Sequence, residues 1–204
     1  MIEKGEINKF AKDFMEQRLG DNLKRMQKTL QTEGKSISRE FTDPFDRLFR
    51  KCLEQQKKGK KKAIRYIHIF YLKSAMLTQK LEYQINAYTE MSYMDETECM
   101  ELWYPSFIMD YYKRDIEELD REAKKRVVRY AYPQLRELQE RWYSVYTVLV
   151  GQYIMQAAGE IVNLDSYKDM EKDDAIQIIY GGYMDKGIQI WPQTILNQDD
   201  GEVK

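Results

Sequence analysis

The chain offers few side chains that act as acids, bases, nucleophiles or soft metal ligands near neutral pH. Its 204 residues include one histidine, His68, and two cysteines, Cys52 and Cys99. Most neutral-pH catalysis and most transition-metal binding use these two residue types. The cysteines lie 47 positions apart (99 − 52), and no carboxylate stands three or four residues from His68. The sequence therefore predicts no catalytic residue, no metal site, no cofactor and a protein that is not an enzyme.

Carboxylates remain as candidates for catalysis, because Asp and Glu can hold Mg²⁺ without help from His or Cys. They are densest at Asp95, Glu96, Glu98 and Glu101, and again over 110–122. The second group alternates with basic residues at helical spacing, which is typical of a solvated helix face. An Asp/Glu-metal dependent hydrolase or nuclease is thus the second alternative function.

A basic stretch over 57–65 is the third feature that could do chemistry. Its six cations are Lys57, Lys58, Lys60, Lys61, Lys62 and Arg65. Such a stretch can bind phosphates through counterion release, and it can also keep a linker solvated. The net charge of the whole chain is −1, which gives no general attraction to nucleic acid. A nucleic-acid-binding protein is the first alternative function.

Five aromatic residues lie close together after the first acidic group. They are Trp103, Tyr104, Phe107, Tyr111 and Tyr112. Trp and Tyr are enriched at binding hot spots, although ordinary core packing produces the same pattern. With no catalytic motif in sight, the sequence favours a non-enzymatic protein-binding module, such as an adaptor, an inhibitor or immunity-type protein, or a chaperone-like protein. Its partner would be another protein or a second copy, bound through this aromatic surface and long charged helices.

Helical elements must position most of these residues. The apolar spacing predicts helices over 5–30, 44–57, 106–131 and 133–162. The polar segment 31–43 has no period and is expected to be a loop, with Pro44 at the first position of the next helix. From about residue 95 we expect the chain to be helical again, with Asp95 or Thr97 as the N-cap.

One helical segment has the length of a membrane span. Trp142–Gly159 contains 18 residues without a charge, but it also contains Ser144, Thr147, Gln152 and Gln156. Glutamine is costly in hydrocarbon, so we expect a buried core helix and no membrane contact. The low cysteine count and the charged N-terminus, which has no apolar run, indicate a cytoplasmic protein.

Two segments have the composition of strands. Residues 81–93 alternate between apolar and polar side chains, and 64–72 is dense in β-branched and aromatic residues, although a helix through 62–79 is a rival interpretation. A second strand-like region spans 175–191. We therefore expect a mostly helical α+β fold with about five helices and a small antiparallel sheet formed by 64–93 and 175–191. Residues 1–196 would form a single domain, or 1–58 a separate helical N-terminal arm, and 197–204 a flexible tail.

Overall fold

The computed structural model describes residues 4–78, 80–126 and 132–192, and the side chains of 4–8, 76, 77, 126 and 132–135 are left out of the description. The helices are α1 (Lys4–Lys57), α2 (Ala75–Thr78), α3 (Ser106–Arg126), α4 (Tyr132–Val162) and α5 (Asp165–Asp169), with a 3₁₀ turn η1 (Ser92–Met94). The strands are β1 (Ile64–Tyr71), β2 (Tyr83–Tyr88), β3 (Met100–Trp103), β4 (Lys172–Gly182) and β5 (Ile188–Trp191). The α+β class predicted from the sequence is confirmed. The expected tail over 197–204 lies outside the described residues.

All five strands form one sheet in the order β3-β2-β1-β4-β5. The expected antiparallel pairing holds for β1 with β2 and for β4 with β5. The purely antiparallel expectation was wrong, because β1 and β4 run parallel, with Ile67 opposite Ile178. A parallel pair needs a long crossover connection, and here α3, α4 and α5 supply it.

Strand β3 lies in a segment where helix was expected. Met100–Trp103 pairs antiparallel with β2, with Trp103 opposite Tyr83. Four residues are too few for a period of two to stand out against the acidic residues before them. The segment 64–72, in contrast, contains strand β1, as the sequence favoured. The rival helix through 62–79 is wrong, because only the single turn α2 of that segment is helical.

Helix α1 replaces the two helices and the loop that the sequence indicated. It is continuous from Lys4 to Lys57 with a kink at Glu33, where φ is −121° and ψ is 15°. Ile37 and Phe41, from the expected loop, are buried and continue at four-residue spacing to Phe45. Pro44 therefore lies inside a helix and does not begin one.

Helix α4 is the apolar helix that the sequence indicated. Its inner face buries Tyr146, Val150 and Ile154, while Val148 on the other side is exposed. Among the residues that the structure describes, no helix has both the length and the hydropathy needed to cross a membrane.

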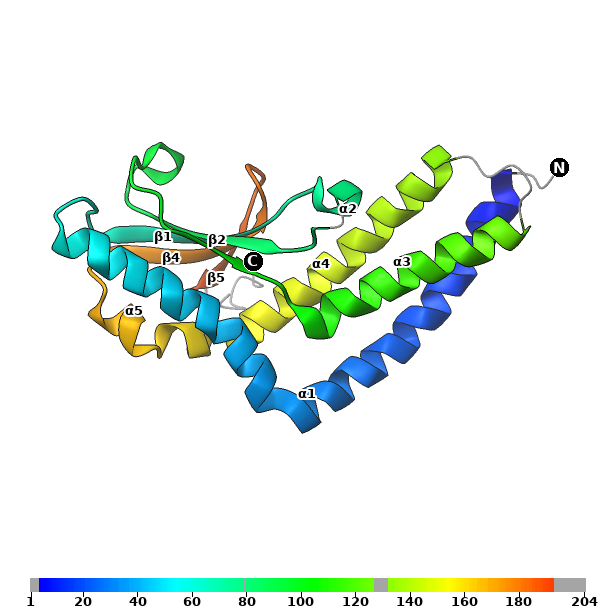
Figure 1. Cartoon of the computed structure of the whole chain (residues 1–204), viewed down its shortest axis with the longest axis horizontal. Coiled ribbons are helices and arrows are strands. Elements are labelled where there is room, and N and C mark those ends of the chain that lie inside the picture. The colour runs from blue at the N-terminus through cyan, green and yellow to red at the C-terminus, as the bar shows by residue number, and fades with distance from the viewer. Residues whose placement is uncertain (1–3, 79, 127–131, 193–204) are drawn as a thin grey trace, which may run out of the picture.

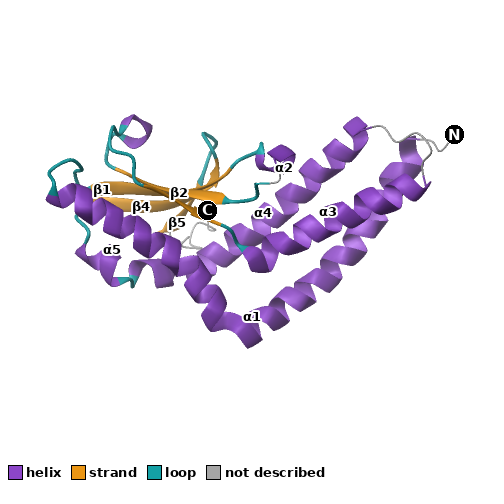
Figure 2. Ribbon diagram, in the orientation of Figure 1, coloured by secondary structure: helices purple, strands orange, loops and turns teal. Residues whose placement is uncertain are grey.

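The sheet has two different faces. The side chains of Ile67, Ile69 and Ile85 point to the face that packs against helices, and we call this the core face. Figures 1 and 2 show α1 and α5 along this side, while the η1 loop and the β4–β5 turn rise from the other side. Because successive side chains of a strand alternate, Tyr66, His68 and Phe70 point to that other side, which we call the open face.

Candidate binding surface on the open face of the sheet

The aromatic residues that the sequence singled out lie mainly in the core. Trp103, Phe107 and Tyr112 are 2%, 8% and 4% exposed, and the Trp103 ring packs edge-on against Phe41 with 5.1 Å between centroids. Tyr104 and Tyr111 are half-buried. The role of these five residues in partner binding stays a prediction. In this conformation a partner could reach only Tyr104 and Tyr111.

The basic stretch is partly used inside the fold. Lys61 is buried, and its Nζ donates to Asp95 Oδ2 at 2.8 Å and to the Thr97 carbonyl at 2.6 Å. Arg65 lies over the Tyr66 ring at 5.7 Å. Lys58 pairs with Glu54 in the last turns of α1. Three cations of the stretch, Lys57, Lys60 and Lys62, are exposed and are in no ion pair of the described structure.

The first acidic group is divided between the interior and the surface. Burial would raise the pKa of Asp95, but hydrogen bonds from Lys61, Thr89 and Thr97 hold it below its ordinary value. Glu101 pairs with Arg47 and with Lys51 on α1. Within the described ranges, no three His, Cys, Asp or Glu side chains come together as metal ligands.

The two cysteines, distant in sequence, meet in the core. Cys52 on α1 and Cys99 before β3 are both buried and free. The hydrogen bond to Cys99, together with burial, raises the pKa of the Cys52 thiol above its usual range. A protonated thiol is a poor nucleophile, so Cys52 packs here as a small apolar residue.

The open face carries a cluster of rings around His68. We call this the open-face cluster, and its members are Tyr66, His68, Phe70, Tyr88, Tyr93 and Tyr183. The His68 ring centroid lies 5.1 Å from Phe70, 5.5 Å from Tyr88 and 5.6 Å from Tyr93. Such edge-to-face and stacked pairs stabilise by about 0.5–1.5 kcal/mol each beyond the area they bury. The cluster therefore forms a firm aromatic layer over the centre of the sheet.

Two loops deliver the outer rings of this cluster. Tyr93 comes from η1 and Tyr183 from the turn between β4 and β5, and their centroids lie 6.1 Å apart. Their neighbours Ser92 and Met184 adopt positive φ values of 52° and 56°. Residues other than glycine seldom adopt this region, and such strained positions concentrate at functional sites. Both strained positions thus lie beside the rings that cover the open face.

Beneath the rings, two polar atoms are buried without a partner in the described structure. They are His68 Nδ1 and Asn86 Oδ1, on residues that are directly opposite each other in β1 and β2. Burial lowers the pKa of His68 to about 4, so its imidazole is neutral at pH 7. His68 thus packs as a neutral ring within the aromatic layer.

Exposed apolar side chains lie in and around the cluster, and we call them the open-face rim. They are Met91, Tyr93, Met94, Leu102, Tyr183 and Met184. Met94 is 75% exposed and Met184 is 68% exposed. Sequence reasoning missed this surface, because these six residues come from three separate segments: the η1 loop, β3 and the β4–β5 turn. One signal was present, since Tyr66, His68 and Phe70 fill the face of β1 that a half-exposed strand would give to polar residues.

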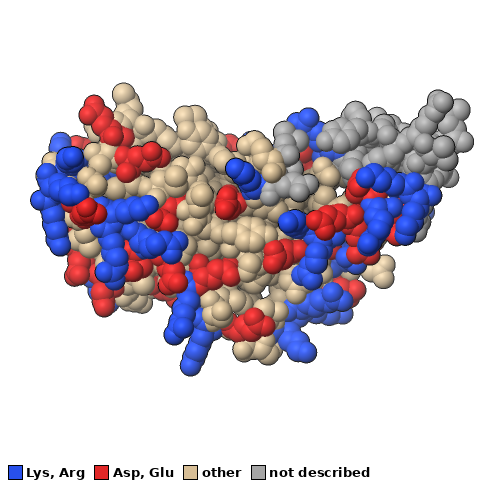
Figure 3. Space-filling view, viewed as in Figure 1, with Lys and Arg blue, Asp and Glu red and all other residues tan. Residues whose placement is uncertain are grey.

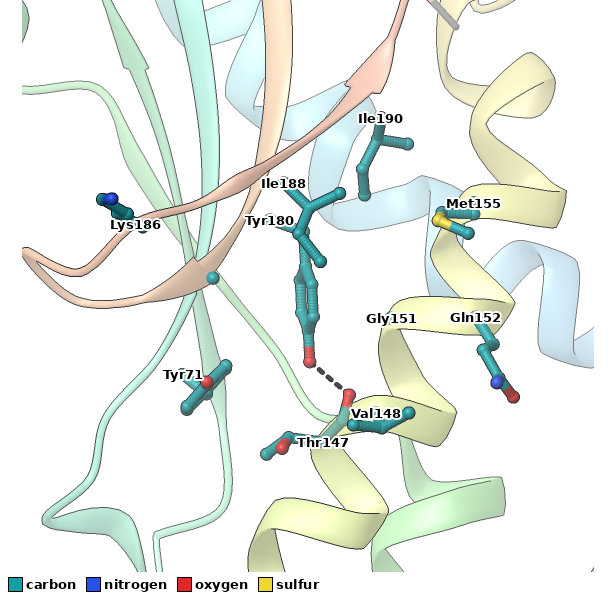
Figure 4. Close-up of a pocket in the computed structure, with 11 residues that line it drawn as sticks. Tyr71, Thr147, Val148, Gly151, Gln152, Met155, Tyr180, Lys186, Ile188 and Ile190 are labelled. Atoms are coloured by element: carbon teal, nitrogen blue, oxygen red, sulfur yellow. Dashed lines mark hydrogen bonds between the residues drawn. The ribbon is translucent and has the colours of Figure 1, made fainter. Parts of the chain in front are cut away.

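A hollow lies between α4 and the β4–β5 hairpin. It has a volume of about 220 Å³ and is lined by apolar side chains that include Val148, Ile188 and Ile190. Figure 4 shows the Tyr180 ring standing between the helix and the hairpin, where its hydroxyl donates to the Thr147 carbonyl at 2.5 Å. This bond fixes α4 to the sheet beside the hollow.

Comparisons with protein-family models, with curated proteins and with solved structures find no match to this chain.

Proposed function

We propose that this chain is a protein-binding module that docks an apolar segment of a partner protein on the open face of its sheet. The observation that carries the proposal is the open-face rim, the six exposed apolar side chains in and around the open-face cluster. Large contiguous exposed apolar patches are uncommon on monomeric proteins and mark interaction sites when they occur. None of the helices α1, α3, α4 and α5 lies across this face (Figure 1).

The ring cluster supports the proposal in a second way. A docking surface gains affinity when it is ordered before the partner arrives, because less side-chain entropy is lost on binding. Within the cluster, Tyr93 contacts four other rings and Tyr183 contacts two. Both side chains nevertheless remain exposed. As part of the same proposal, the module works in the cytoplasm, which the low cysteine count supports.

The test compares two pairs of exposed apolar residues in the full-length chain. Met94→Ser/Met184→Ser changes the open-face rim, and Leu23→Ser/Leu30→Ser changes exposed leucines on α1 as a matched control. Tagged wild type, rim variant and control are each used to isolate bound protein from source cells. We expect one stoichiometric partner with wild type and control, and loss of that partner with the rim variant.

Equal recovery of the partner by all three proteins would place binding elsewhere on the molecule. Thermal unfolding of the three proteins is measured alongside, since exposed substitutions of this kind change the free energy of unfolding by less than about 0.5 kcal/mol.

A further inference from the structure

The open-face rim has acidic neighbours. Between Lys80 and Lys113 the chain carries no Lys or Arg, and it contains seven acids: Glu82, Glu90, Asp95, Glu96, Glu98, Glu101 and Asp110. The loop that carries η1 lies in the middle of this stretch. Figure 3 shows acidic side chains gathered over the loop at the upper left, on the side of the molecule that the open face occupies.

Three of these acids are already bound within the fold. Asp95 accepts from Lys61, Glu101 pairs with Arg47 and Lys51, and Asp110 accepts from the Tyr104 hydroxyl. Each of these carboxylates has lost part of its capacity to attract a partner.

Three others are available to a partner. Glu90, Glu96 and Glu98 are exposed, and no ion pair joins them to a cation in the part of the chain that the structure describes. Glu90 is adjacent to Met91, and Glu96 follows Met94 by two positions, so negative charge and flexible apolar side chains alternate along one loop. Charges at the edge of an interface select a partner of opposite sign and accelerate its arrival.

The shape of the site favours a helix as occupant. The core face of the same sheet is covered by helices, with α1 running along it, and the open face presents the same pleated surface. Methionine adapts to the side chains of an inserted helix, and for this reason it is common at surfaces that bind amphipathic helices.

We infer that the open face binds a basic amphipathic helix of another protein. Its apolar stripe contacts Met91, Met94 and the exposed edge of Tyr93, and its Lys or Arg residues lie over Glu90, Glu96 and Glu98. This inference rests on the proposed function and adds the chemistry of the partner to it.

Two synthetic peptides of equal length test the charge preference. The first is a helix-forming peptide with Leu and Met at every third or fourth position and Lys at the remaining positions. The second has the same apolar stripe with Glu in place of each Lys. Binding of each labelled peptide to the full-length protein is measured by fluorescence anisotropy at low and at moderate salt.

Three protein variants accompany the wild type. Glu90→Gln/Glu96→Gln/Glu98→Gln removes the acidic rim, and Met91→Ser/Met94→Ser removes apolar contacts of the same loop. Asp13→Asn/Asp21→Asn/Asp165→Asn removes the same number of exposed charges from α1 and α5 and serves as the control.

We expect the basic peptide to bind about tenfold more tightly than the acidic one, and the acidic-rim variant to lose about tenfold in affinity for it. The control variant keeps wild-type affinity, and added salt weakens binding of the basic peptide to wild type because exposed charges are screened.

Other outcomes overturn the inference in distinguishable ways. Equal affinity for the two peptides, or equal affinity of the rim and control variants, rejects the charge preference. The proposed function then survives only if Met91→Ser/Met94→Ser abolishes binding of both peptides. If that variant binds like wild type, or if neither peptide binds, both proposals fail. A dimer of the protein alone that is lost in the methionine variant assigns the face to a second copy and rejects the basic partner.

Discussion

His68 is a buried titratable side chain at the centre of the open-face cluster. It is the chain's one histidine, it is 8% exposed, and its Nδ1 has no partner among the described residues. Burial lowers its pKa from 6.5 to about 4. The folded state thus binds this proton less readily than the unfolded chain does.

This difference makes the stability of the protein depend on pH. The contribution of neutral His68 is fully present above pH 6.5 and is lost progressively as the pH falls from 6.5 towards 4. His68→Phe keeps an aromatic ring and removes the titration. We expect the urea midpoint of wild type to fall further than that of His68→Phe between pH 7 and pH 4.5. Parallel decreases in the two proteins would show that His68 titrates normally.

Two glycines on helix α4 offer a comparison at the scale of an element. A Cβ on Gly151 would lie 2.7 Å from Tyr180 Cε1, while a Cβ on Gly159 would meet nothing within 4 Å. Alanine is favoured over glycine inside a helix by about 0.8–1 kcal/mol. At Gly151 this gain is opposed by displacement of the Tyr180 ring, whose hydroxyl is bound to Thr147 on the same helix.

We therefore expect Gly159→Ala to raise the free energy of unfolding by about 0.5–1 kcal/mol. Gly151→Ala should lower it, because the ring that fixes α4 to the sheet must shift. Chemical unfolding of both variants at pH 7 measures the two changes. A stabilising Gly151→Ala would mean that α4 moves away from β4 without cost.

Comparison of elements also shows what the sequence could and could not reveal. The alternation over 81–93 identified β2, because a period of two is a property of the strand itself. The helical segment over 31–43 was missed although Ile37 and Phe41 continue the spacing of Phe45, since polar neighbours hid a stripe of two residues. The pairing of β1 with β4 joins positions more than 100 residues apart, as for Ile67 and Ile178, and no local pattern encodes it.

The candidate site was hidden for the same reason. Tyr93 and Tyr183 are brought together by two loops that are far apart in the chain, and each alone looks like an ordinary exposed tyrosine. Most of the five aromatic residues that are close in sequence, by contrast, are buried in the core. Aromatic residues that are close in sequence pack together in the core of this chain. The exposed aromatic surface could be recognised only from the tertiary structure, because that structure brings its residues together.

At the scale of the whole molecule, one buried carboxylate connects three helices. Asp115 on α3 is 1% exposed and accepts from Arg18 at 3.0 Å, from Asn22 at 2.8 Å and from Tyr146 at 2.7 Å. Arg18 and Asn22 belong to α1, and Tyr146 belongs to α4. Figure 1 shows these three helices running together away from the sheet.

Removal of this carboxylate should loosen that region. Asp115→Ala removes the acceptor shared by Arg18, Asn22 and Tyr146, while Arg18 keeps its pair with Glu118 and Asn22 keeps its bond to the Tyr146 hydroxyl. We expect a cost below the roughly 3–5 kcal/mol of a fully buried charged pair, because the Arg18 side chain is 32% exposed. We expect hydrogen exchange to accelerate in α3 and in the first half of α1, while the amides of β1 and β4 keep their protection. Asp120→Ala on the same helix is the control, because this half-buried carboxylate pairs only with Lys124 one turn along α3 among the described residues. Uniform acceleration across the sheet would show that the molecule opens as one unit.

The central position of β1 governs the order in which the chain can fold during its synthesis. Residues of β1 leave the ribosome before those of β4, and β2 and β3 can pair on one edge soon afterwards. The other edge of β1 waits for β4, which begins at Lys172 after α3, α4 and α5 have been made. During that interval a row of unpaired backbone groups beside Ile67 and Ile69 is available to other nascent chains. A ribosome that stalls before Lys172 would therefore release a fragment whose hydrophobic central strand has one unprotected edge.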